Sequence, residues 1–148
     1  TSKENPETMN GSGTNPTDAL GILPFRMVDA YSQKRISGVA GGVNSTEYSF
    51  NMVILTKDKL DFDSLWIDGY ALKLYIAQKS PIQSGERTSF EINDTISVRA
   101  SLPSTKAHVT SIPPVKMEGV ALVSYKGNGL MSYFNIESIK RKPDILGQ

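Results

Sequence analysis

Residues 115–142 read VKMEGVALVSYKGNGLMSYFNIESIKRK, and this stretch decides the fold. It contains two runs of alternating apolar and polar side chains that meet at Gly127-Asn128-Gly129. An Asn-Gly pair is the strongest short-range signal for a two-residue β-turn, because a type I′ turn needs a positive φ angle at both central residues. The stretch therefore predicts a tight β-hairpin.

The turn also fixes which residues of the hairpin lie opposite each other. The expected facing pairs on its apolar side are Ala121–Ile136, Val123–Phe134 and Tyr125–Ser132. A slip of one residue would move Ala121 and Val123 beside polar side chains, so the register is strongly specified. The basic residues 140–142 and Pro143 are expected to close the hairpin and to protect its edge from pairing with other chains.

The preceding chain repeats this pattern of short alternating runs separated by turn residues. The expected strands are residues 25–36 and 47–56, two runs within 64–78, and a bent or interrupted strand pair within 88–101. Asp29 interrupts the first run and predicts a bulge or bend there, and Asp68-Gly69 predicts a second tight turn. Residues 102–114 contain prolines that exclude a central strand, so we expect a connection.

The whole pattern predicts an all-β fold. No stretch of about twelve residues has the spacing of an amphipathic helix. About seven or eight antiparallel strands with frequent turn signals favour a two-sheet sandwich, and a small barrel remains the alternative. Since 148 residues suit a single domain, we predict that residues 20–148 form one β-sandwich domain.

Residues 1–19 have a different composition from the rest. They are rich in threonine, asparagine, glycine, serine and proline. Such a segment cannot bury enough apolar surface to offset the entropy lost on ordering, so we predict a flexible linker. It is either the tether that follows a cleaved signal peptide, with or without a lipid anchor, or a linker within a longer chain.

Composition argues against several classes of function. The 16 basic and 15 acidic residues give a net charge of +1, which produces no overall field to attract nucleic acid or an anionic membrane. The apolar runs are too short to cross a bilayer. With no cysteine, the chain has no disulfide and no thiolate chemistry. We expect no nucleic-acid partner, and membrane contact only through a lipid anchor outside this sequence.

Few residues suggest catalysis or metal binding. The single histidine, His108, lies in a proline-flanked polar stretch, and no Gly-x-Ser-x-Gly motif accompanies it. Asp58, Asp61 and Asp63 could offer oxygen ligands to calcium, but the lysines among them favour a charged turn. We predict no catalytic residue, no metal site and no cofactor. A hydrolase that uses paired carboxylates stays open as an alternative, because the sequence does not fix how far apart the glutamates lie.

The aromatic residues near Asp68-Gly69 are the candidate ligand-binding residues. If Leu65 and Ile67 face the core, then Trp66 faces outward with Tyr70 and Tyr75, and the three would form a platform for a sugar or a partner side chain. The other interpretation, which we favour, makes Trp66 the buried tryptophan of the sandwich core. In the run that follows, Tyr75 is expected to face outward.

From Gly38 onward, the order of turns and strands resembles that of small, uncharacterised surface lipoproteins of Bacteroidetes bacteria. The resemblance rests on Gly41-Gly42, Tyr48, Phe50, Leu65–Gly69, Phe90, Asn93–Val98, Gly119–Leu122, Tyr125 and Asn128-Gly129. It implies an immunoglobulin-like sandwich in the bacterial cell envelope, in the periplasm or at the outer-membrane surface, or a secreted one. It implies no activity.

Together these patterns predict a noncatalytic extracytoplasmic module that binds an unknown protein or glycan. The first alternative is a structural subunit or adaptor that pairs an edge strand with a partner protein. The second is the carboxylate-based hydrolase.

Overall fold

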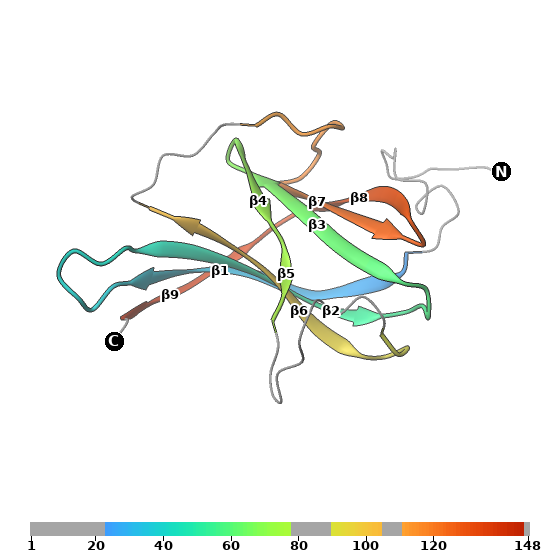
Figure 1. The fold of residues 1–148 in the computed structure, drawn as a ribbon, viewed down its shortest axis with the longest axis horizontal. Helices are drawn as coiled ribbons and strands as arrows, with labels where there is room; N and C mark the ends of the chain where they lie inside the picture. Colours follow the sequence, from blue (N-terminus) through green and yellow to red (C-terminus); the bar gives the residue numbers. More distant parts are fainter. Residues whose placement is uncertain (1–22, 78–89, 105–110, 147–148) are drawn as a thin grey trace.

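The computed structural model describes residues 23–77, 90–104 and 111–146, and these form two β-sheets packed face to face (Figure 1). The strands are β1 (Phe25–Ile36), β2 (Ser45–Ile54), β3 (Leu60–Ile67), β4 (Tyr70–Lys73), β5 (Tyr75–Ile76), β6 (Thr95–Pro103), β7 (Ala121–Gly127), β8 (Leu130–Ile136) and β9 (Lys140–Leu146). The predicted all-β, two-sheet sandwich is confirmed. Within these ranges no helix is long and apolar enough to cross a membrane.

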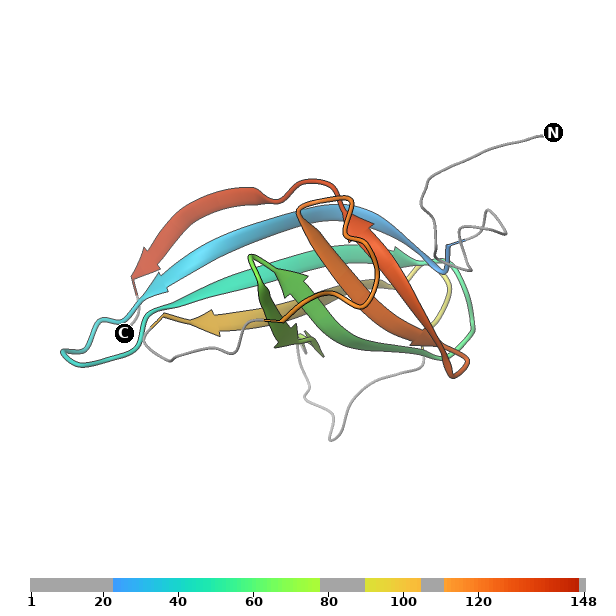
Figure 2. The same ribbon diagram turned by 90° about the horizontal axis from the view of Figure 1, so that it is seen from above.

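One sheet has five strands in the order β5-β6-β2-β1-β9, and the other has four in the order β4-β3-β7-β8. All pairs are antiparallel except β1–β9, which is parallel. At the end that carries the β1–β2 loop, the long strands of the five-stranded sheet extend beyond the four-stranded sheet (Figure 2). The five-stranded sheet therefore presents a long outer surface.

The predicted hairpin forms with the predicted register. Ala121 pairs with Ile136, Val123 with Phe134 and Tyr125 with Ser132. The φ angles of Asn128 and Gly129 are 52° and 85°, as a type I′ turn requires. Asp68 and Gly69 form a second turn of the same kind, with φ angles of 52° and 84°.

Strand β1 contains the predicted bulge. Its pairing with β2 shifts between Met27 and Asp29. The extra residue moves Tyr31 to the face opposite Phe25, although strict alternation along residues 25–36 would place the two side chains on one face. Phe25 is 1% exposed in the core, whereas Tyr31 lies on the outer surface.

The end of the chain differs from the prediction. Residues 140–142 do not close the hairpin; instead they begin β9, which crosses to the other sheet and pairs with β1. The basic residues and Pro143 nevertheless lie on an edge strand, the position in a sheet where proline is tolerated. The described residues therefore contain one strand more than the expected maximum of eight.

Two other stretches also differ. The run 70–76 divides at Leu74, so that β4 belongs to one sheet and β5 to the other. Of the strand pair expected within 88–101, the described residues contain only the second strand, which begins at Thr95. Phe90–Asp94 forms a turn instead, in which Asn93 has a φ angle of 75°. Pro103 is the last residue of β6, where the strand tolerates it.

Apolar side chains from both sheets fill the space between them. Phe25 makes ring contacts with three aromatic neighbours at centroid distances between 5.2 and 5.7 Å. These neighbours, Phe62, Tyr125 and Phe134, all belong to the four-stranded sheet. Edge-to-face pairs of this kind stabilise a core beyond simple burial, so Phe25 ties the first strand to the opposite sheet.

Tyr48 is the core residue whose ionisation the fold alters. Its side chain lies in the core, where burial raises the pKa of the phenol above its ordinary value of 10.0, and the Asp68 carboxylate raises this pKa further. In the unfolded chain the phenol ionises at its ordinary pKa, so the unfolded state loses the proton first as the pH rises. The Tyr48 contribution to stability is complete below about pH 10 and is lost as the pH rises toward the folded pKa.

We therefore expect the free energy of unfolding to fall less between about pH 8 and about pH 11 in Tyr48→Phe than in wild type. Urea unfolding followed by circular dichroism at both pH values measures this free energy. Tyr75→Phe, at an exposed position, is the control and should keep the wild-type pH dependence. An unchanged pH dependence in Tyr48→Phe would contradict the assignment.

Candidate functional site

The three aromatic residues predicted to form a platform lie on three different surfaces. Trp66 pairs with Leu122 of β7 and faces away from the core, and it is half-buried. Tyr70 pairs with Ile67 and packs against the core. Tyr75 belongs to β5, in the other sheet, and is 42% exposed. The structure therefore brings none of the three together.

Trp66 is not part of the core between the sheets, so the interpretation that we favoured from the sequence is wrong. Leu65 and Ile67 are 0% and 5% exposed in that core, and strand alternation turns Trp66 to the opposite face. What covers Trp66 is residues 111–120, which we call the strap. The Trp66 Nε1 donates a hydrogen bond to the Ser111 Oγ at 3.4 Å.

The strap crosses the outer face of the four-stranded sheet from the β3–β4 turn to the end of β8. The Ser111 N–H donates to the Gly69 carbonyl at 2.7 Å, and the Val120 N–H donates to the Ile136 carbonyl at 2.8 Å. Its odd-numbered residues are half-buried and its even-numbered residues are exposed, so one side faces the sheet.

This cover explains why β7 is buried on both faces. Leu122 is 0% exposed and Ser124 is 1% exposed, although both point away from the core. The Ser124 hydroxyl is also used within the sheet, where it accepts from the Ser64 N–H at 3.1 Å. The outer face of the four-stranded sheet is therefore largely closed to a ligand.

The outer face of the five-stranded sheet is different. Cross-strand pairing places one outward-facing residue of each strand in a line across the sheet. This transverse row consists of Tyr75, Arg99, Ser49, Tyr31 and Lys140. We call the outward-facing side chains of β5, β6, β2, β1 and β9 the five-stranded face.

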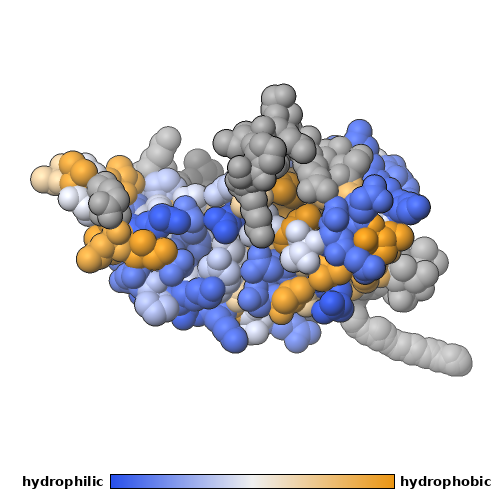
Figure 3. Space-filling view, turned by 90° about the horizontal axis from the view of Figure 1, so that it is seen from below, coloured by the Kyte–Doolittle hydropathy of each residue, from blue (hydrophilic) through white to orange (hydrophobic). Residues whose placement is uncertain are grey.

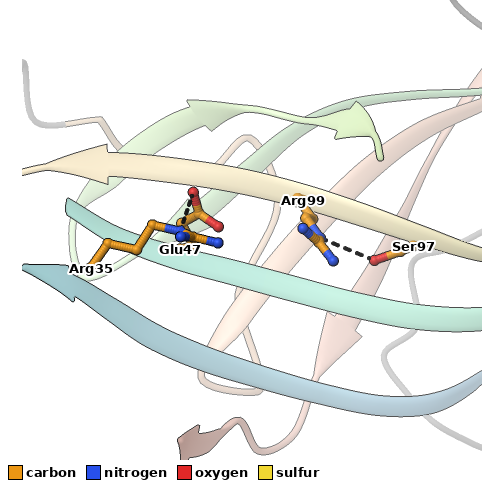
Figure 4. A network of polar contacts seen from close by, with 4 residues as sticks. All are labelled: Arg35, Glu47, Ser97 and Arg99. Carbon is orange, nitrogen blue, oxygen red and sulfur yellow. Dashed lines mark hydrogen bonds and ion pairs between the residues drawn. The ribbon is translucent and has the colours of Figure 1, made fainter. Parts of the chain in front are cut away.

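Two polar contacts hold cations in place on this face (Figure 4). The Arg99 Nε donates to the Ser97 Oγ at 3.3 Å, along β6. The Arg35 Nε lies 3.2 Å from the Glu47 Oε2, across the β1–β2 pair. Arg99 is half-buried, and the small Ser49 beside it, at 2% exposure, leaves room for the side chains on either side.

A third cation is held at the far end of the row. The Lys142 Nζ lies 3.7 Å from the centroid of the Tyr31 ring, a cation–π contact. Next to it, the Gln33 Nε2 donates to the Pro143 carbonyl at 2.9 Å, which ties β9 to β1 through a side chain. The five-stranded face therefore has fixed positive groups on both sides of Ser49.

Basic side chains outnumber acidic ones on the five-stranded face. The basic ones are Arg26, Arg35, Arg99, Lys140 and Lys142, and the acidic ones are Asp29 and Glu47. Asp29 accepts a hydrogen bond from the Asn51 Nδ2 at 2.7 Å. In the view from this side, the visible surface next to the hydrophobic left end is mostly hydrophilic, and further hydrophobic residues lie in the right half (Figure 3).

The other candidate residues are less informative. His108, Glu86 and residues 1–19 lie outside the described residues. Among the residues that are described, no three histidine, aspartate or glutamate side chains gather closely enough to hold a metal ion. Asp58, Asp61 and Asp63 do not form such a group.

The sequence contains a signal for the outer side of the five-stranded sheet. In β6, Ser97, Arg99 and Ser101 alternate with buried apolar residues, and β2 has the same polar alternation. Alternation identifies the outward side of each strand, but not which strands are neighbours.

Comparison of the chain with protein-family models, with curated proteins and with solved structures gave no match.

The strap should be sensitive to its last glycine. A Cβ at Gly119 would collide with the backbone of Ile136, so Gly119→Ala should cost about 1–3 kcal/mol and loosen the strap. Trp66 is the only tryptophan, so its fluorescence should shift to longer wavelength as its cover loosens. Gly129→Ala is the control, because it strains a turn with a φ angle of 85° but meets nothing within 4 Å. Equal emission spectra for the two variants would contradict this role of the strap.

Proposed function

We propose that this protein is a noncatalytic extracytoplasmic binding module and that the five-stranded face binds its ligand. The observation that carries the proposal is the transverse row, which lines up two tyrosines and two cations across all five strands. A rigid sheet positions such side chains more accurately than a mobile loop does.

The prior positioning of these side chains supports a binding role. Ser97 holds Arg99, and the Tyr31 ring holds Lys142, before any ligand arrives. Each long side chain that is already ordered avoids an entropy cost on binding of about 0.5–1.5 kcal/mol. A ligand that bridges these two cations would gain affinity from that order.

The spacing of the carboxylates on this face supports binding over hydrolysis. Asp29 pairs with Asn51, and Asn51 lies four residues from Glu47 along β2. That separates the two backbone positions by about 13 Å. The carboxylate pairs of glycosidases lie roughly 5–9.5 Å apart, so backbone positions this distant disfavour Asp29 and Glu47 as such a pair.

The strand order supports an immunoglobulin-type sandwich. The five-stranded sheet contains the order β1-β2-β6-β5, which corresponds to strands A, B, E and D of such domains, and β3-β7-β8 corresponds to C, F and G. In this assignment β4 and β9 are additions at the sheet edges. The resemblance to Bacteroidetes surface lipoproteins supports a place in the cell envelope, which fractionation of the source cells would test.

We expect Tyr75→Ala/Arg99→Ala to abolish glycan or protein binding while the fold is retained. Screening of wild type on an array of neutral and charged glycans and of envelope proteins identifies the ligand. Lys73→Ala/Leu130→Ala removes one cation and one large exposed side chain from the four-stranded sheet and should bind as wild type does. Ligand binding that survives in the first variant, or conversion of the ligand into a product, would overturn the proposal.

A second candidate, a structural subunit that pairs with further copies, is supported by β8. This edge strand has the sequence LMSYFNI, with no charge and no proline, whereas β9 at the edge of the other sheet has both. In the described part of the chain, no strand pairs with the outer side of β8. Uncharged edges of this length favour β-pairing between chains.

For this candidate, we expect concentration-dependent dimers in sedimentation velocity. Met131→Lys should shift them to monomers, because a charge on an edge strand opposes pairing. Lys126→Met, on the neighbouring strand, is the control and should leave the dimers unchanged. A strict monomer at every concentration would count against the structural subunit.

A further inference from the structure

We propose that the ligand of the five-stranded face is an extended polysaccharide that carries carboxylate groups. This inference rests on the proposed function and names the ligand class that the same face would take. The charge of the face, the spacing of its fixed cations and the side chains beside them support this ligand class.

Four cations of the face have no acidic partner among the described residues. Within the described ranges, the ion pairs are Arg35–Glu47 and Arg141–Asp144, so Arg26, Arg99, Lys140 and Lys142 are not neutralised there. The chain as a whole has a charge of only +1. The excess positive charge is therefore a local property of this face, and it complements an anionic ligand.

The two fixed cations suit separate anionic groups on one extended molecule. Arg99 and Tyr31 lie two strands apart in the same row, about 10 Å, and Lys142 sits over the Tyr31 ring. A single small anion could not reach both. The Arg99 guanidinium uses its Nε for Ser97, which leaves its terminal N–H groups to form hydrogen bonds with a carboxylate.

The side chains between and beside these cations suit the hydroxyl groups of a sugar. Ser101 and Ser97 flank Arg99 on the outer side of β6, and both are half-buried. Ser101 pairs with Glu47, whose carboxylate is already taken by Arg35. Between Arg99 and Tyr31 the row contains only Ser49, which is 2% exposed, so no bulky side chain separates Arg99 from the Tyr31 ring.

The same features disfavour two other classes of anionic partner, an acidic protein surface and single-stranded nucleic acid. The centre of a protein interface is usually depleted of charged residues, whereas this face has five basic and two acidic side chains. Single-stranded nucleic acid binds by stacking its bases on exposed aromatic rings. Lys142 already covers one side of the Tyr31 ring, which leaves Tyr75 as the one freely exposed ring of the row.

The experiment measures binding of polygalacturonate by isothermal titration calorimetry at low salt. A neutral glucan, an oligothymidylate and an acidic peptide of similar length are the comparison ligands. We expect polygalacturonate to bind, and its affinity to fall as sodium chloride is added. Arg99→Gln and Lys142→Gln should each weaken binding about 10-fold or more, as expected for loss of one charge-assisted hydrogen bond.

Lys73→Gln is the matched control, because it removes one positive charge from an exposed position on the other sheet. It should leave the affinity for polygalacturonate within about twofold of wild type. Thermal unfolding of each variant verifies that the fold is intact. A loss of affinity in Lys73→Gln equal to that in Arg99→Gln would overturn the inference, because it would indicate nonspecific attraction.

The remaining outcomes separate the two proposals. If the neutral glucan binds and Arg99→Gln abolishes that binding, the ligand class is wrong and the proposed function stands. If the oligothymidylate or the peptide binds more tightly than polygalacturonate does, the inference is also overturned. If changes on the five-stranded face affect no ligand at all, both proposals fail.

Discussion

The structure depends on the register of β2, the central strand of the five-stranded sheet. Its even-numbered residues Tyr48, Phe50, Met52 and Ile54 are buried in the core, and its odd-numbered residues build the outer surface. A shift of one residue would exchange the two sets, placing Glu47 and Asn51 in the core at a cost of several kcal/mol for each unpaired polar group. The register of β2 therefore determines both which of its residues enter the core and which form the proposed binding surface.

The hairpin at residues 121–136 could be predicted in full, because its turn, its pairs and its apolar face are all local. The bulge near Asp29 could also be predicted, but its effect on Tyr31 could not be seen without a partner strand to define the faces. Pairing of β9 with β1 joins residues more than a hundred positions apart, and no turn signal marks it. The transverse row depends on the same kind of distant pairing, between Ser49 and Arg99 and between Tyr31 and Lys140.

Trp66 illustrates a different limit of sequence analysis. Alternation predicted correctly that Trp66 would face outward if Leu65 and Ile67 were in the core. It could not indicate that a proline-containing connection would return over that face and cover it. The strap has the alternation of a strand but pairs with the sheet mainly at its ends, so sequence patterns alone describe it as a loop. As a result, only Tyr75 of the three aromatic residues singled out in the sequence belongs to the transverse row, and Tyr31 is its other aromatic member.

The parallel pairing of β9 has a consequence for biosynthesis. Among the described strands, β1 is translated first, and β9, the partner for its outer side, is translated last. Until β9 arrives, that side of β1 is an exposed sheet edge whose amide and carbonyl groups can pair with another chain. The finished sheet ends instead in β9, whose basic residues and proline oppose such pairing.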